Sequence, residues 1–346
     1  MLIMTTSKII KRREFLKKTA IAGTVGTVAA AKFSTPAISK NLVQWSMTTT
    51  WPKNFPGLGT GANKLAELVK QASGGRMTIK VYGAGELVPA FDAIDAVSNG
   101  TVEMGHGSAY YWKGKVPAAQ FFASMPFGLT TQEQNAWLEF GGGQELGDKV
   151  YAEMGCKFFP SGNTGVQMGG WYNKPMNAIE DYKGLKMRIP GLGGEVAKAA
   201  GATVVNLPGG ELLSSMQSGA IDAMEWVGPY NDLAFGIHKV AKHYYYPGWH
   251  EPATILDCFI NLKAWNALPK DLQTIIEMAN KTVNQHVWNE FTARNATALG
   301  TLRSKHNVIP NMFNPIMLLS MKQLADKVIA DLSQADPLSK EIYNSL

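Results

Sequence analysis

The residue types that perform catalysis or hold cofactors are not arranged here in a pattern that defines an active site. Residues 57–62, GLGTGA, fit the G-x-G-x-x-G/A pattern of dinucleotide sites, but prolines interrupt the approach and no acidic residue ends the following strand. The chain has no G-x-x-x-x-G-K-[ST], H-E-x-x-H or G-x-S-x-G motif. Its six histidines lack metal-ligand spacing, and we interpret the one notable cluster, Trp249-His250-Glu251, as loop packing. No nucleophile or general base stands out, so we predict that the protein is not an enzyme.

The elements that would position functional residues alternate between strand-like and helix-like patterns. In the first half these are, in order, a strand at 42–51, a helix at 63–73, a strand at 77–83, a helix at 86–99 and a strand from 102. A second round begins near 157, and helical patterns cover 270–305 and 315–332, followed by a short tail. The β-α-β-α-β order predicts parallel sheets with helices on their faces, in an α/β protein of two lobes.

The basic charge of the chain is confined to its N-terminal region. The 346 residues include 33 Lys+Arg and 27 Asp+Glu, a net charge of +6. Eight of these basic residues and one acidic residue lie in positions 1–40, which leaves 25 basic and 26 acidic residues, a net charge of −1, in the remainder. A nearly neutral body does not bind polyanions through bulk charge, so we expect no nucleic-acid partner.

The N-terminal region has the pattern of an export signal. Residues 12–17, RREFLK, closely resemble the twin-arginine signal, and the uncharged stretch 19–31 that follows is shorter than the ~20 apolar residues of a membrane-spanning helix. We predict a cleaved signal over residues 1–40, cut after Ala31 or Ala37, and a periplasmic protein. The alternative is a basic tail or an amphipathic arm.

The two cysteines, Cys156 and Cys258, are compatible with an oxidising compartment. They could pair in a disulfide or remain as two buried thiols. We favour the free thiols.

An exported, nearly neutral, aromatic-rich body of two lobes suits a solute receptor that closes on a small ligand. Four segments carry a specific resemblance: TGVQMGGWYNKP (164–175), YKGLKMRIPG (182–191), ATVVNLPGGELLSSMQSGAIDAMEWVGPYND (202–232) and YPGWHEP (246–252). They resemble the solute receptors of tripartite ATP-independent periplasmic (TRAP) transporters, and most closely the branch that binds 2-oxo or 2-hydroxy monocarboxylates with a metal cation.

The resemblance implies a two-lobed periplasmic binding-protein fold with a ligand cleft between the lobes and long C-terminal helices bracing both. We place lobe I at residues 41–164 plus about 252–298, and lobe II at 165–251 plus about 299–346.

The resemblance also implies the roles of the residues that would hold the ligand. Arg188 would clamp the ligand carboxylate, as a guanidinium fork matches a carboxylate in both charge and shape. Asn206 matches the cleft asparagine of the family, although it could instead cap a turn. Gln167, Glu225 and the backbone carbonyl of Trp226 would ligate the cation, an oxygen set that suits Na⁺ or Ca²⁺.

Aromatic residues of lobe I would supply the apolar wall of the site. The candidates are Tyr110, Tyr111 and Trp51, with Trp249 and Phe127 as further ones. An aromatic side chain at such positions could equally belong to the core.

The resemblance implies that the partners are a small organic carboxylate and the membrane subunits of a TRAP transporter. The apolar run 313–320 could also pair two copies by exchange of C-terminal helices. Two alternatives stay open: an exported oxidoreductase with an unrecognised cofactor, and a metal-free receptor for another organic acid.

Overall fold

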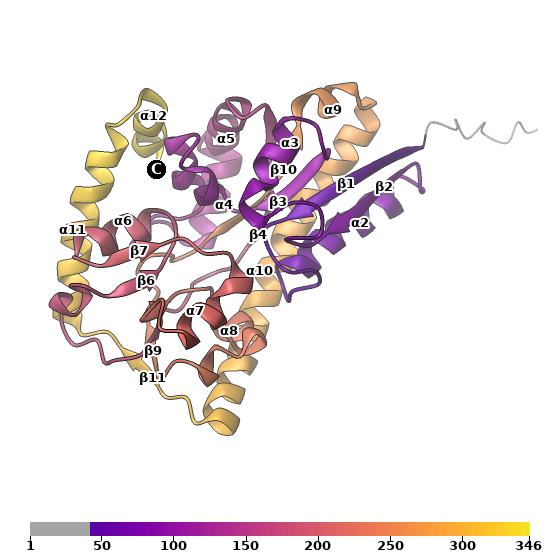
Figure 1. Cartoon of the computed structure of the whole chain (residues 1–346). Helices are drawn as coiled ribbons and strands as arrows, with labels where there is room; N and C mark the ends of the chain where they lie inside the picture. Colours follow the sequence, from indigo (N-terminus) through magenta and orange to yellow (C-terminus); the bar gives the residue numbers. More distant parts are fainter. Residues whose placement is uncertain (1–41) are drawn as a thin grey trace, which may run out of the picture. The chain divides into compact units, whose positions relative to one another are not determined.

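The computed structural model describes residues 42–346, and these residues form one compact unit (Figure 1). The predicted export signal and both predicted cleavage points lie outside the described residues. Within 42–346, no helix is both long enough and apolar enough to cross a membrane.

Cys156 and Cys258 are both buried and free, which confirms the prediction of two thiols.

The first of two sheets has the strand order β2-β1-β3-β10-β4. Its strands are β1 (Val43–Thr49), β2 (Met77–Tyr82), β3 (Met104–Gly107), β4 (Cys156–Asn163) and β10 (Ile255–Asn261). β1 pairs in parallel with β2 and β3, whereas β10 runs antiparallel to both β3 and β4. The parallel pairing predicted from the β-α-β-α-β order is present between β1, β2 and β3, whereas β10, which that order did not include, makes the sheet mixed. β10 reaches the sheet on the return path from the second sheet, so no β-α-β crossover fixes its direction.

The second sheet has the order β11-β9-β5-β8-β6-β7 and is also mixed. Its strands are β5 (Gly170–Tyr172), β6 (Lys186–Arg188), β7 (Thr203–Val205), β8 (Ala223–Met224), β9 (His243–Tyr246) and β11 (Pro310–Met312). β6 runs parallel to β7 and β8, and β5 runs antiparallel to β8 and β9. We call the first sheet with its helices lobe I, and the second lobe II.

Helices cover both sheets (Figure 1). Those of lobe I are α2 (Gly59–Ala72), α3 (Ala93–Ser98), α4 (Thr131–Phe140), α5 (Gly143–Ala152) and α9 (Leu262–Ala267), with the 3-10 turns η1 (Ala90–Asp92), η2 (Ala109–Trp112) and η3 (Pro117–Phe122). Those of lobe II are α6 (Gly191–Ala199), α7 (Leu212–Gln217) and α8 (Pro229–Phe235), with η4 (Ile179–Tyr182), η5 (Gly209–Glu211) and η6 (Ile237–Lys239). The helix predicted at 86–99 is shorter than expected because Pro89 keeps an extended backbone ahead of η1.

Three C-terminal helices connect the lobes: α10 (Lys270–His306), α11 (Pro315–Ser333) and α12 (Pro337–Ser345). α10 packs on β4 and α2 of lobe I and on α8 of lobe II, and α11 packs on α6. α12, which the sequence analysis treated as a tail, packs on α5 and η3 of lobe I. The predicted two-lobed α/β fold braced by a long C-terminal helix is confirmed, while the exact lobe boundaries stay a prediction.

Candidate ligand and cation site

Arg188 ends strand β6 and is buried, with 1% of its side chain exposed. Its Nε donates to the carbonyl of Leu207 at 3.1 Å, and its Nη1 donates to the carbonyl of Glu225 at 2.5 Å. The guanidinium carbon lies 5.1 Å from the ring centre of Trp226. Nη2 is buried and has no hydrogen-bond partner among residues 42–346. A fixed arginine with one free donor is suited to an anionic oxygen.

Glu225 reaches Arg188 because β8 pairs with β6, Met224 lying opposite Arg188. The carboxylate Oε2 of Glu225 lies 3.2 Å from Nη1 of Arg188, and its Oε1 lies 3.5 Å from Nε2 of His250. Burial raises the pKa of Glu225 to about 8, although the charge of Arg188 opposes the shift. Taking an acid this far out of water is costly unless a positive charge joins it.

A second buried carboxyl, Glu251, lies beside Gln167. The Nε2 of Gln167 donates to Oε2 of Glu251 at 2.7 Å and to the hydroxyls of Thr164 and Thr254 at 3.0 Å each. The hydroxyl of Thr254 also donates to Glu251. Burial, and next the charge of Glu225, raise the pKa of Glu251 to about 7. These bonds leave Oε1 of Gln167 buried and without a partner among the described residues.

Three ionisable side chains converge at this point. Glu225, His250 and Glu251 each offer one ligand atom within 4.8 Å of the others. Burial lowers the pKa of His250 to about 4, so its ring is neutral at pH 7. Oxygen ligands dominate the group when Oε1 of Gln167 is included, and such a set suits a hard cation.

The sequence analysis interpreted His250 and Glu251 as loop packing, and it did not place them at the site. The structure brings both against Glu225. The signal that could have found them was their position in YPGWHEP, one of the four segments that carry the resemblance.

Lobe I covers this group with aromatic side chains. Tyr110 and Tyr111 lie on η2, with ring centres 4.7 Å apart in an edge-to-face arrangement. Burial and the charge of Glu251 raise the pKa of the Tyr110 hydroxyl, and Arg188 opposes that shift across the lobes. At Gly191 (φ +58°), a Cβ atom would lie 3.0 Å from Cβ of Tyr110, so the lobes approach closely here.

Of the other predicted aromatic residues, Trp249 contacts the charged group through His250, whereas the ring contact of Trp51 is with His106. Trp249 stacks on Phe127 at 5.9 Å between ring centres and meets His250 at 5.5 Å. Trp51 is buried in lobe I, edge-on to His106 at 5.3 Å.

Asn206, by contrast, lies just after the edge strand β7 and is exposed, so the structure does not bring it into the buried group. Its neighbour Leu207 is the residue whose carbonyl receives Nε of Arg188. The predicted role of Asn206 in ligand binding stays a prediction.

The two lobes are in contact around the site. Lys113 of lobe I forms an ion pair with Glu195 of lobe II at 2.6 Å. The side-chain amide of Asn231 donates to the carbonyl of Pro56 at 2.9 Å. These two contacts join lobe I to lobe II.

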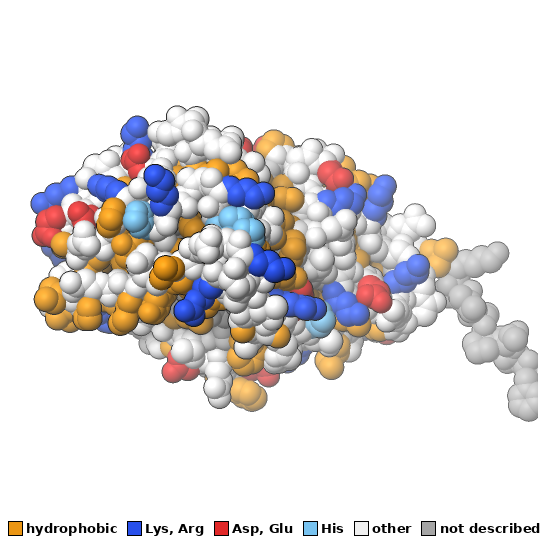
Figure 2. Space-filling model, turned by 90° about the horizontal axis from the view of Figure 1, so that it is seen from below, with side chains coloured by type: hydrophobic (Ala, Val, Ile, Leu, Met, Phe, Trp, Pro, Cys, Tyr) orange, Lys and Arg blue, Asp and Glu red, His pale blue; other side chains and the backbone are white. Residues whose placement is uncertain are grey.

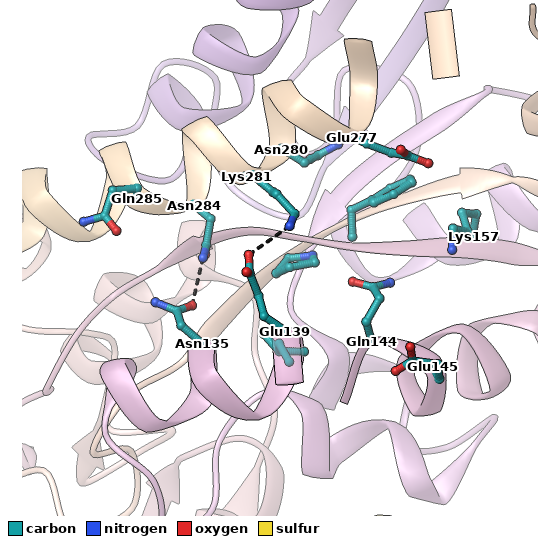
Figure 3. A pocket seen from close by; sticks show the side chains of 13 residues that line it. Asn135, Glu139, Gln144, Glu145, Lys157, Glu277, Asn280, Lys281, Asn284 and Gln285 are labelled. Atoms are coloured by element: carbon teal, nitrogen blue, oxygen red, sulfur yellow. Dashed lines mark hydrogen bonds and ion pairs between the residues drawn. The ribbon is translucent and has the colours of Figure 1, made fainter. Parts of the chain in front are cut away.

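A separate hollow of about 380 Å³ lies in lobe I, between α4, α5, β4 and α10 (Figure 3). None of the predicted site residues lines it. Lys281 of α10 forms an ion pair with Glu139 of α4 at 2.9 Å, and Asn284 donates to Asn135 at 2.9 Å (Figure 3). These two polar contacts across the hollow therefore connect α10 to α4.

A buried arginine and carboxyl cluster between two α/β lobes in contact is the arrangement expected of a solute-binding receptor. Residues 47–335 match the family described as bacterial extracellular solute-binding protein, family 7, and the chain belongs to this family. It is a periplasmic TRAP-type receptor and not an enzyme, as predicted, and the oxidoreductase alternative is thereby set aside.

Three relatives are close over most of their length. A monocarboxylate 2-oxoacid-binding periplasmic protein of Nostoc sp. is 44% identical, over 96% of this chain and 92% of that protein. A TRAP periplasmic solute-binding protein of Pseudoalteromonas atlantica, solved with bound sodium and pyruvate, is 42% identical with a TM-score of 0.85, covering 88% of this chain and 92% of that one. A TRAP solute-binding protein of Bordetella bronchiseptica, solved as a dimer with calcium and picolinate, is 36% identical with a TM-score of 0.86, covering 88% and 90%.

Proposed function

We propose that this receptor binds a small 2-oxo or 2-hydroxy monocarboxylate together with Na⁺ or Ca²⁺, for uptake through a TRAP transporter. The observation that carries the proposal is the buried pairing of Arg188, whose Nη2 is free, with Glu225, whose Oε1 has no hydrogen-bond donor among residues 42–346. The free donor suits a ligand carboxylate, and the free acceptor suits a cation.

The residues present fit a hard cation. Gln167 and Glu225 each have a buried oxygen without a hydrogen bond among residues 42–346, and Glu251 lies within 4.8 Å of Glu225. These residues, with the backbone carbonyl of Trp226, would hold the ion. The carboxylate and the neighbouring oxo or hydroxyl oxygen of the ligand would together chelate the bound ion. Pyruvate and picolinate, named for two relatives, both place a second donor atom next to a carboxylate.

Charge balance further supports a cation. With Glu225 and Glu251 ionised, a bound monocarboxylate adds a third negative charge, and Arg188 balances only one. A Ca²⁺ ion makes the buried site neutral. A Na⁺ ion does so only if one carboxyl keeps its proton, which the pKa values of about 8 and about 7 allow near neutral pH.

The same charges disfavour other ligands. A dicarboxylate would bring a second carboxylate toward Glu225 and Glu251 with no second arginine in the buried group. We therefore expect weak binding of malate or succinate, and this is the point that separates the proposal from a metal-free receptor for another organic acid.

A thermal-shift series tests the proposal. The chelator-treated protein is heated with pyruvate, lactate, 2-oxobutyrate, acetate or succinate, each with Na⁺, with Ca²⁺ and with a choline salt. We expect a rise in Tm only where a 2-oxo or 2-hydroxy acid and a cation are both present. An equal rise with acetate, or with pyruvate in choline, would contradict the proposal.

We also propose that two copies of the chain form a homodimer through the run 313–320. The exposed side chains Ile316 and Leu319 on α11 support this proposal. Light scattering of the Ile316→Glu variant tests it, and a dimer that survives this change would contradict it.

We further propose that the protein is exported by the twin-arginine route. Replacing Arg12→Lys together with Arg13→Lys should retain the protein in the cytoplasm. Export that survives this double change would contradict the proposal.

A further inference from the structure

Three segments that meet in lobe II contain no acidic residue. These are residues 165–179, 233–250 and 291–325. The sheet brings them together, because β5 pairs with β9 and β9 pairs with β11. The rings of His238 and His306, 4.1 Å apart, also join η6 to the end of α10.

Basic side chains project from this face. Lys239 ends η6 and Lys242 follows it, and Arg303 and Lys305 lie in the last turn of α10. All four are exposed. None of the four forms an ion pair within the described part of the chain. Figure 2, which views the molecule from below, shows Lys, Arg and His side chains gathered in the middle of this face with hydrophobic side chains beside them.

Apolar side chains are exposed on the same face. Ile309 and Met312, in and next to β11, are 77% and 58% exposed. Tyr246 and Val166 are exposed as well, and with Ile309 and Arg303 they line a groove of about 450 Å³. We call these four apolar residues, with the four basic residues of the preceding paragraph, the basic apolar face.

We infer that the basic apolar face is a docking surface for a lipid bilayer that carries anionic phosphate headgroups. Clustered Lys and Arg side chains draw a protein to an anionic bilayer, and neighbouring aliphatic and Tyr side chains fit the boundary between headgroups and acyl chains. The inference concerns a surface apart from the proposed ligand site and does not depend on it.

The charges of this face also favour a lipid bilayer over a second copy of the chain or an acidic protein. A second copy of the chain seated on the same face would bring four basic residues against four, which is repulsive. An acidic protein surface would satisfy the charges, but the exposed Ile309 and Met312 favour a partner that also offers an apolar layer.

Vesicle sedimentation tests the inference with the mature protein. Each basic residue near an anionic bilayer contributes roughly five-fold in the partition coefficient. Arg303→Gln with Lys305→Gln should therefore lower partitioning onto phosphatidylglycerol vesicles about 25-fold. The matched control is Lys70→Gln with Lys263→Gln, two exposed lysines of lobe I that form no ion pair within residues 42–346, which should leave the partitioning unchanged. Binding should be absent on phosphatidylcholine vesicles.

Three further measurements could overturn the inference. Equal sedimentation of the Arg303/Lys305 variant and the control would show that these basic residues do not contribute to vesicle binding. Release by millimolar inorganic phosphate, beyond that caused by chloride of equal ionic strength, would identify a site for free phosphate instead. An absence of wild-type binding to vesicles of any composition would leave an acidic protein surface as the occupant. Unchanged circular dichroism and Tm exclude misfolding of either variant.

Discussion

The substitution Glu225→Gln should have opposite effects on the cation-free and the cation-bound receptor. Oε2 of Glu225 faces Nη1 of Arg188 at 3.2 Å, and Oε1 faces Nε2 of His250 at 3.5 Å. A glutamine fits both neighbours, because its oxygen can accept from Arg188 and its amide can donate to the neutral His250. The substitution therefore removes the charge with little change in shape.

The expected size of the effect follows from the pKa of this carboxyl. Its pKa is about 8 in the folded protein against 4.5 as a reference. The folded state therefore binds the proton more tightly than the unfolded state, and stability is lost as the pH rises from 4.5 to 8. In cation-free buffer the penalty is about 1 kcal/mol at pH 5 and about 4 kcal/mol at pH 8. The glutamine variant escapes this penalty and should be more stable than the wild type by up to that amount.

Urea unfolding at pH 5 and pH 8, after treatment with a chelator, measures this difference. Repeating the series with pyruvate and Ca²⁺ should reverse the order, since only the wild type gains stability from the cation. A variant that is less stable than the wild type in cation-free buffer at pH 8, or that keeps the full stabilisation by Ca²⁺, would refute the reasoning.

Three other expectations concern the same site. Arg188→Ala should abolish pyruvate binding in calorimetry while circular dichroism stays native, and Arg188→Lys should recover only part of the affinity because an ammonium lacks the guanidinium fork; wild-type affinity of the alanine variant would contradict the assignment. Cation affinity should fall as the pH drops from 8 to 6, by up to about tenfold per pH unit for each displaced proton, because Glu225 and Glu251 bind protons below about 8 and about 7; a flat profile in calorimetry would argue against carboxyl ligands. Gly191→Ala should weaken lobe closure and pyruvate affinity, since φ is +58° and the added Cβ would lie 3.0 Å from Cβ of Tyr110, and small-angle scattering with and without ligand would detect a loss of closure; unchanged scattering and affinity would show that Gly191 does not contribute to the lobe contact.

The sequence predicted the parts of the site that lie at the ends of regular strands. Arg188 and Glu225 are charged residues at the ends of short apolar strands, and such positions are unfavourable without a partner. The resemblance to the TRAP receptors implied the roles of both residues, and this local pattern agreed with it. Gln167 came from the resemblance, and its environment of Thr164 and Glu251 came only from the structure.

The remaining features depend on contacts between distant segments, which local patterns do not contain. His250 and Glu251 belong to the loop after β9, and they meet Glu225 only because β5 lies between β8 and β9 in the sheet. The direction of β10 depends on the chain's return from lobe II. The helix α12 is nine residues long, and its position on α5 and η3 depends on a tertiary contact rather than on its own pattern.

The most direct test of the ligand assignment is a calorimetric titration of pyruvate into the chelator-treated receptor, in choline buffer and in the same buffer with Ca²⁺ or Na⁺. The buried carboxyls of Glu225 and Glu251 oppose an anion until a cation joins them, so we expect saturable binding with either cation and no measurable heat without one. Equal affinity in all three buffers would contradict the proposed cation-bridged binding of a 2-oxo acid.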